Sequence, residues 1–159
     1  MAPQKYNARD CFFEIEDFLS PGTWTAFRTA SAGSGVGGIN TFSRSFEYEA
    51  VDTTTFGSQG RAETENMQEG MSITLEGFRL KDPSTGALDP AMALAEAQAA
   101  RLGADSQCGF RFAAPGDTTW EVWADATFQL GDQGGGNNDK ATWSVTVTRS
   151  GPSTTAAKP

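Results

Sequence analysis

Hydrophobic and polar residues alternate most regularly between residues 119 and 149. The first half of this segment, TTWEVWADATFQL, places apolar residues on even positions and polar residues on odd positions, with Trp123 as the exception. After the loop GDQGGGNNDK, the same alternation resumes in ATWSVTVTR. A period of two is typical of a half-buried strand. The pattern therefore predicts a long antiparallel hairpin, and its apolar face must be covered by earlier parts of the chain.

Several earlier segments show the same period and are separated by turn signals such as Ser20-Pro21-Gly22. Turns rich in glycine and proline between short alternating runs are typical of a mainly β protein. We therefore expect a β-sandwich. The additional strands are predicted in residues 11–17, 41–56, 71–80 and 108–112.

One helix is predicted, over residues 90–102. Asp89 is a suitable N-cap, Pro90 suits the first helical position, and AMALAEAQAARL is rich in strong helix formers, with Gly103 able to close the C-terminal end. We expect this helix to flank the sandwich and cover one open side. Its packing face is predicted to comprise Met92, Leu94, Ala95, Ala99 and Leu102.

The length of 159 residues fits one domain. Residues 1–10 lack periodicity and are predicted to be an N-terminal arm, residues 11–149 the single β domain, and residues 150–159 a disordered tail or a strap. Within the domain, residues 57–70 (GSQGRAETENMQEG) are polar and without a hydrophobic period, which predicts a long loop between two strands. Loops of this length in compact domains are usually functional or disordered.

Charge narrows the range of partners. The net charge is −8, and the 12 lysines and arginines are scattered, which disfavours tight binding to nucleic acid. The chain has no run of 18 apolar residues, and its first residues lack the apolar core of a signal peptide, so we expect a soluble protein made in the cytoplasm, with no membrane association.

The residue types also narrow the chemistry. The chain has no histidine, which removes the commonest general base and metal ligand, and its two cysteines, Cys11 and Cys108, lie far apart. Glycines 33, 35 and 38 have the spacing of a dinucleotide-binding loop, but a strand-like segment follows them where a helix is needed, which favours a flexible connector over residues 31–38. We therefore expect no cofactor, no metal and no catalytic residues: the protein is predicted not to be an enzyme.

Two segments, VDTTTFG (51–57) and EGMSITLEGF (69–78), resemble the tail tube (major tail) proteins of long-tailed bacteriophages. The resemblance continues through the Asp-Pro helix start and the strands WEVWADATFQL and ATWSVTVTRSG, in the same order over roughly residues 10 to 150. The glycine-rich insert departs from the pattern, and the immunoglobulin-like domain that some relatives carry is absent. The resemblance implies a tail tube fold, in which a β-sandwich with one flanking helix assembles as a hexameric ring.

In this family the rings stack into a hollow tube, part of the virion tail, through which the genome passes to the host. The resemblance therefore implies that the chain's main partner is itself, with sheets closing into a β-barrel around a lumen. It also implies tape-measure, tail terminator and tail-tip proteins as partners, DNA that passes without specific binding, and assembly in the host cytoplasm.

Two groups of charged residues are our candidates for function. Three glutamates on the polar faces of the strands beside the long loop would repel DNA if those faces line the lumen, although an ordinary solvated sheet face has the same pattern. The long loop and the N-terminal arm are candidates for contacts between stacked rings. The lumen candidates are Glu47, Glu49 and Glu76, and the inter-ring candidates are Arg61, Glu63 and Glu65.

Two alternatives remain open from the sequence alone. The first is a carbohydrate- or receptor-binding β-sandwich of a virion or cell surface, in which tryptophans stack on sugars and Trp123, on the polar face, is the main contact. The second is a glycosidase that uses Glu121 and Asp125 as paired acids, four residues apart on one strand.

Overall fold

A computed structural model describes residues 2–29 and 37–159 of the chain. It is mainly β with one α-helix in the described part, as predicted, and the helix is α1 (Pro90–Ala99). Short 3-10 turns occur at Ala8–Asp10 (η1), Phe56–Ser58 (η2) and Gly103–Ser106 (η3). The strands are β1 (Phe12–Glu16), β2 (Trp24–Ala26), β3 (Ile39–Asp52), β4 (Thr64–Phe78), β5 (Gln107–Ala113), β6 (Thr119–Leu130), β7 (Thr142–Ser150) and β8 (Thr154–Ala157).

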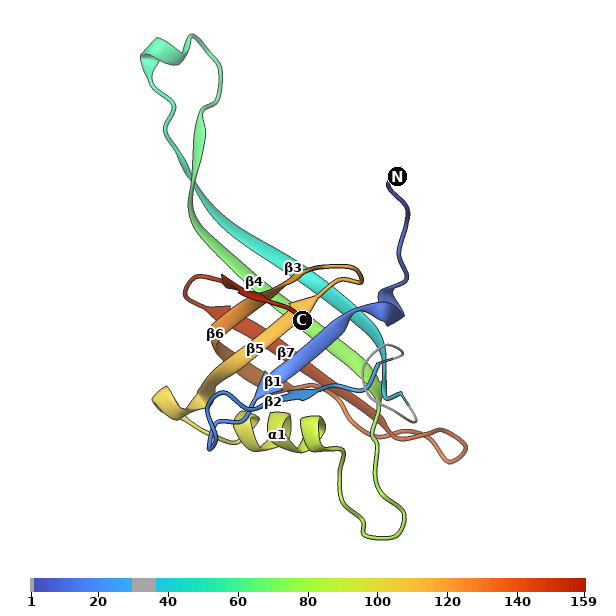
Figure 1. Cartoon of the computed structure of the whole chain (residues 1–159). Helices are drawn as coiled ribbons and strands as arrows, with labels where there is room; N and C mark the ends of the chain where they lie inside the picture. Colours follow the sequence, from blue (N-terminus) through green and yellow to red (C-terminus); the bar gives the residue numbers. More distant parts are fainter. Residues whose placement is uncertain (1, 30–36) are drawn as a thin grey trace.

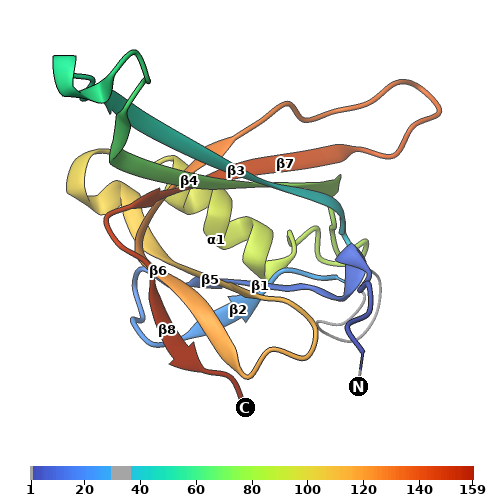
Figure 2. The ribbon, with the colours of Figure 1, turned by 90° about the horizontal axis from the view of Figure 1, so that it is seen from above.

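The strands form one antiparallel sheet and not the two sheets of the predicted sandwich. The strand order is β2-β1-β5-β6-β7-β4-β3, and β8 pairs with β6 beyond the end of β7. The sheet curls strongly, so that β3, β4 and β7 lie on one side of the interior and β1, β2 and β5 on the other (Figures 1 and 2). The single chain does not close this sheet into a barrel, because β2 and β3 are its two edges.

The core fills the concave side of the curled sheet. The predicted 119–149 hairpin is confirmed as the antiparallel pair β6–β7, and β7 contributes Trp143, Val145 and Val147 to the core. Helix α1 lies at an open end of the sheet, between its two sides (Figure 2), and contacts β6, β1 and β2. None of the helices among the described residues is long and apolar enough to span a membrane.

Helix α1 begins at Pro90 as predicted but ends at Ala99, three residues early. Gln98 is buried, and its side-chain amide donates a hydrogen bond of 2.7 Å to the backbone oxygen of Asp105, which pulls the following segment across the helix end. Leu102 therefore leaves the predicted packing face and is exposed, and Gly103 adopts a φ of 68° that a glycine allows.

A β-bulge in β6 corrects the prediction for Trp123. Cys108 pairs with Ala126 and Phe110 with Trp123, so Ala124 and Asp125 together oppose the single residue Gly109. The extra residue reverses the alternation, and Trp123 turns into the core, where it is fully buried against Phe110 and Phe112.

The predicted loop over residues 57–70 is also wrong in extent. Strand β4 begins at Thr64 and pairs with β3 from Thr64–Asp52 down to Gly77–Ile39, with a bulge at Met67, so only residues 53–63 form the tip of a long hairpin. The polar residues of this segment are held as a strand by main-chain pairing with β3 and not by burial. The hairpin projects beyond the rest of the sheet (Figure 1).

The predicted C-terminal tail contains a short strand. Residues Thr154–Ala157 pair with β6 along the edge that β7 leaves free, and the ammonium of Lys158 lies 4.3 Å from the centre of the Phe12 ring. The segment is thus a strap, one of the two predicted states. The connector over residues 31–38 lies mostly outside the described residues, including Gly33 and Gly35.

Candidate functional site

The convex side of strands β6, β7, β4 and β3 forms a continuous polar face. The strand register aligns small hydroxyl residues across it, and the Thr74 and Thr146 hydroxyl oxygens lie 3.2 Å apart. None of its side chains is buried, whereas in the body of the sheet the apolar residues between them, such as Ile73, Leu75, Val145 and Val147, belong to the core. We define the polar face by Thr41, Ser43, Ser45, Glu47, Glu49, Gln68, Gly70, Ser72, Thr74, Glu76, Thr127, Gln129, Ser144, Thr146 and Thr148.

All three predicted lumen glutamates lie on this polar face. Glu76 pairs with Thr41 near the body of the sheet, Glu47 pairs with Gly70, and Glu49 pairs with Gln68 farther along the hairpin. All three are exposed, and the polar face as defined contains no lysine or arginine. The face therefore carries an uncompensated negative charge, spread along β3 and β4.

The opposite face of the projecting hairpin carries two exposed aromatic side chains, Phe46 and Tyr48, on β3 and polar residues on β4. It continues the core face of β3, where Phe42 packs against Phe13 with ring centres 5.0 Å apart. Beyond the body, however, Phe46 is 48% exposed and Tyr48 59% exposed. These two residues were not among the predicted site residues, because their alternation is the same as that of a buried strand. The length of the strand-like run over residues 41–56 was the one signal that part of this strand extends beyond the sheet.

The hairpin tip (residues 53–63) is held by local hydrogen bonds. The Asp52 carboxylate accepts a hydrogen bond of 2.8 Å from the Thr54 amide, and the Thr55 amide donates to the Ser58 hydroxyl at 3.0 Å. Hydrogen bonds from the Thr54 side chain and amide lower the pKa of Asp52 below its ordinary value of 3.8. These contacts form a defined turn that presents the side chain of Phe56 fully exposed to solvent.

The structure brings the inter-ring candidates together at the tip. Arg61 and Glu63 lie in the turn, and Glu65 lies in β4 opposite Val51, not in a loop. All three are exposed, and none forms an ion pair within the described part of the chain. Their charges are available to a neighbouring molecule.

The structure does not support the two alternatives. The indole of Trp123 is buried in the core and cannot stack on a sugar, and Trp120 and Trp143 are also buried. Glu121 is ion-paired with Arg44 at 2.8 Å, and the bulge in β6 breaks the regular spacing that would place it beside Asp125.

Cys11 and Cys108 are buried free thiols, and burial raises the pKa of Cys108 to about 12. In residues 2–29 and 37–159, no three acidic or cysteine side chains are grouped to hold a metal ion.

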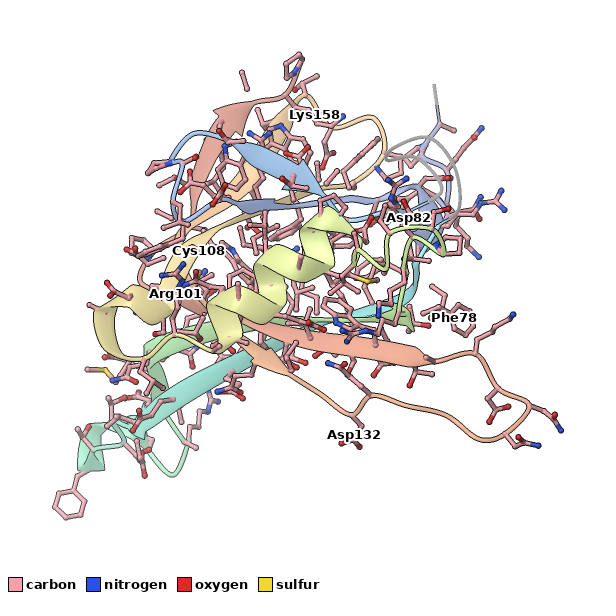
Figure 3. All side chains as sticks on the ribbon, turned by 90° about the horizontal axis from the view of Figure 1, so that it is seen from below. Phe78, Asp82, Arg101, Cys108, Asp132 and Lys158 are labelled. Atoms are coloured by element: carbon pink, nitrogen blue, oxygen red, sulfur yellow. The ribbon has the colours of Figure 1, made fainter. Side chains whose placement is uncertain are left out.

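Another projection leaves the sheet at the far end from the hairpin tip. The β6–β7 loop, residues 131–141, extends from the end of the sheet where Phe78 and Asp132 lie (Figure 3). The long layer of β3, β4, β6 and β7 therefore carries one exposed projection at each end (Figure 2).

Comparison with known proteins finds similar solved structures but no similar sequence family. No family model matches the chain, and no curated protein matches it. A chain in the tail of an empty gene transfer agent particle, refined helically with C6 symmetry, is similar in structure, with a TM-score of 0.65 and 20% identity over 96% of this chain and 100% of that one.

A second similar chain comes from the virion of a native gene transfer agent particle, with a TM-score of 0.59 and 16% identity over 96% of this chain and 100% of that one. Both matches span nearly all of this chain. The chain therefore has the fold of a component of a phage-like tail, as its resemblance to tail tube proteins implied.

Proposed function

We propose that this protein is the tube-forming subunit of a phage-like tail. Copies assemble as six-membered rings, and the rings stack into a hollow tube that conducts the genome out of the particle. The protein acts as a structural component of the virion and not as an enzyme. Its fold, which it shares with a chain from a tail of C6 symmetry, supports this assembly.

One observation carries the proposal: a four-strand layer that is core on one side and uncovered, polar and acidic on the other. The layer ends in β3, a strand of 14 residues that, among the described strands, pairs with β4 alone. A long edge strand with free hydrogen-bonding groups is a template for pairing with another chain. Closure of the sheets around a ring satisfies this edge and turns the polar face toward the centre.

The dimensions fit such a ring. If each subunit contributes four strands, six subunits contribute about 24 strands to one barrel. At a spacing of about 4.8 Å and a tilt of about 40°, the barrel has a backbone diameter of about 50 Å. A DNA duplex passes through an opening of that size with space for water and ions.

The glutamates of the polar face then line the lumen. Glu47, Glu49 and Glu76 repel the phosphates of DNA, and at physiological salt this repulsion acts within about 8 Å. It prevents adhesion at the wall without blocking passage along the centre. Hydroxyl side chains between the glutamates keep the wall hydrated.

Contacts between rings come from the projections at the two ends of the layer. The hairpin tip, with Arg61, Glu63 and Glu65, reaches toward a neighbouring subunit, and the N-terminal arm adds to this contact. Single exposed ion pairs contribute only about 0 to 1 kcal/mol, so the sixfold repetition supplies most of the binding strength. Tape-measure, tail terminator and tail-tip proteins complete the assembly.

The test is negative-stain electron microscopy of the purified protein over a wide concentration range, with light scattering after size exclusion on the same samples. We expect six-membered rings or hollow tubes and a mass that rises with concentration. A protein that remains monomeric at every concentration up to its solubility limit, also in the presence of tail-tip complexes, contradicts the proposal.

A further inference from the structure

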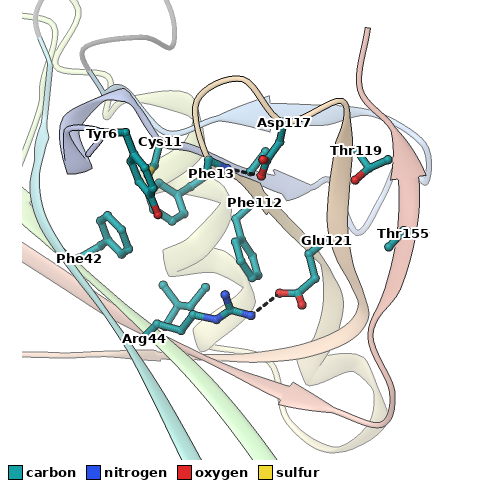
Figure 4. A pocket seen from close by; sticks show the side chains of 13 residues that line it. Tyr6, Cys11, Phe13, Phe42, Arg44, Phe112, Asp117, Thr119, Glu121 and Thr155 are labelled. Atoms are coloured by element: carbon teal, nitrogen blue, oxygen red, sulfur yellow. Dashed lines mark hydrogen bonds and ion pairs between the residues drawn. The ribbon is translucent and has the colours of Figure 1, made fainter. Parts of the chain in front are cut away.

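An aromatic pocket opens between the two sides of the curled sheet. Its volume is about 470 Å³, within the range of sites that enclose a ligand. Phe13, Phe42 and Phe112 form its apolar walls, and Tyr6 of the N-terminal arm lies at its rim (Figure 4). The pocket lies outside the polar face and has no part in the proposed lumen.

A charged pair forms one side of the pocket. The Arg44 guanidinium bonds to the Glu121 carboxylate at 2.8 Å and lies 4.8 Å from the centre of the Phe112 ring (Figure 4). An aromatic group that enters the pocket can form aromatic–aromatic contacts with the phenylalanine rings and a cation–π contact with the guanidinium. The pocket is therefore suited to an aromatic side chain.

The same chain presents such a side chain. Phe56 is fully exposed on a turn fixed by the Thr55 and Ser58 hydrogen bonds, so it loses little conformational freedom on binding. The hairpin leans away from η1 and the start of β1, which border the pocket (Figure 1). Strand β3 extends about 20 Å beyond Phe46, at about 3.3 Å per residue, and this carries the tip away from the chain's own pocket. The tip therefore points away from the chain's own pocket and is presented to a neighbouring molecule.

The charges at the two surfaces are complementary. Arg61 is in the same turn as Phe56 and is the only cationic side chain of the hairpin tip, residues 53–63. The pocket lining carries two carboxylates, Asp117 and Glu121, and one cation, Arg44, which is paired with Glu121. The lining therefore has one net negative charge, from Asp117, that Arg61 of another copy can approach.

We propose that Phe56 of one copy inserts into the aromatic pocket of a second copy, with Arg61 beside Asp117 of that pocket. The contact joins two different surfaces, so it repeats from copy to copy and closes a ring or extends a stack. This inference rests on the proposed function and specifies which surfaces carry the assembly. Phe56 is its anchor, and aromatic anchors of this kind dominate interface energetics.

Disulfide trapping tests the contact directly. The double variant Phe56→Cys, Thr119→Cys places one thiol on the tip and one in the pocket lining, and Ser84→Cys, exposed on a distant turn, replaces Thr119→Cys in the matched control. We expect a ladder of multimers under oxidising conditions. Mass spectrometry should identify bonds between positions 56 and 119, or between position 56 and the pocket residue Cys11, and none to position 84.

Substitution of the anchor tests its contribution. We expect Phe56→Ser to raise the concentration needed for assembly about thirtyfold, the effect of a typical aromatic anchor. Phe56→Tyr should restore assembly. Leu102→Ser removes another highly exposed apolar side chain elsewhere and should leave assembly unchanged. Thermal unfolding of each variant checks that the domain remains folded.

The outcomes separate this inference from the proposed function. Rings or tubes formed by Phe56→Ser at the wild-type concentration, with no bonds between position 56 and the pocket, overturn the inference and leave the proposed function intact. Bonds between position 56 and the pocket in a protein that forms no ring or tube support the contact and overturn the proposed function. Rescue of a folded but unassembled Phe56→Ser by free phenylalanine analogues in the pocket identifies a small-molecule site, which also overturns the inference.

Discussion

Strand β3 places apolar residues on one face along most of its length, but this face lies in two different environments. In the body of the sheet, Leu75 and Ile73 are completely or almost completely buried. In the projecting half, Phe46 and Tyr48 occupy the same face and remain about half exposed. The first half is stabilised within the chain. The second half leaves aromatic side chains exposed on that face, and in the proposed assembly a neighbouring molecule covers them.

The largest expected effect comes from removing a core side chain of the body. Leu75→Ala deletes a fully buried side chain opposite Phe42 and should lower the free energy of unfolding by about 2–5 kcal/mol. Urea denaturation followed by tryptophan fluorescence measures this change. A loss below about 1 kcal/mol contradicts the assignment of Leu75 to the core.

The matched substitution in the projecting half should act on assembly and not on folding. The double variant Phe46→Ser, Tyr48→Ser removes exposed side chains, so its free energy of unfolding should change by about 1 kcal/mol or less. Its assembly, followed by light scattering, should weaken by about tenfold or more because two aromatic contacts are lost. Normal assembly together with a strong loss of stability would show that Phe46 and Tyr48 stabilise the fold and not the assembly, which contradicts the prediction.

A third substitution tests the opposite face of the same strands. Replacement of Glu47, Glu49 and Glu76 by lysine should leave the fold intact, because all three side chains are exposed. If this face lines the lumen, assembled variant tubes should retain nucleic acid at low salt and release it as salt rises. Replacement of the same three glutamates by glutamine is the control, because it removes the negative charges without introducing positive ones. Absence of retained nucleic acid from lysine-variant tubes places the polar face outside the lumen.

The sequence patterns predicted correctly those strands and that helix whose buried and exposed faces differ in polarity. The β6–β7 hairpin followed from alternation, and the start of α1 followed from Asp89 and Pro90, because these signals act within a few residues. Trp123 was mispredicted because its orientation depends on a bulge against Gly109, which belongs to a different strand. The break in alternation at Trp123 is visible in the sequence, but β6 alone does not show that a bulge turns this side chain into the core.

Long-range pairing limited the remaining predictions. The start of β4 lacks a hydrophobic period, since pairing with β3 holds it without a core beneath, and it was therefore mistaken for a loop. One curled sheet and two packed sheets bury the same alternating residues. The alternation therefore could not distinguish the observed curled sheet from the predicted sandwich. The glutamates of the polar face were found because alternation places them there. Phe46, Tyr48 and Phe56 were missed because an exposed aromatic residue has the same pattern as a buried one.

The smallest expected effect concerns the order of the hairpin tip. The Thr54 hydrogen bonds lower the folded-state pKa of Asp52, so its contribution to the turn is present above the ordinary pKa of 3.8 and is lost as pH falls through the lower folded value. The Thr54 amide resonance should therefore shift only under acid conditions, and Asp52→Asn should remove that titration. Asp82 provides an internal control, because the amides of Ser84 and Thr85 lower its pKa in a similar turn. In Asp52→Asn the Ser84 amide should titrate as in the wild type. If the Thr54 amide resonance titrates in Asp52→Asn as it does in the wild type, contacts other than the Asp52 carboxylate hold the tip in order. The projecting half would then differ from the body of the sheet in burial alone.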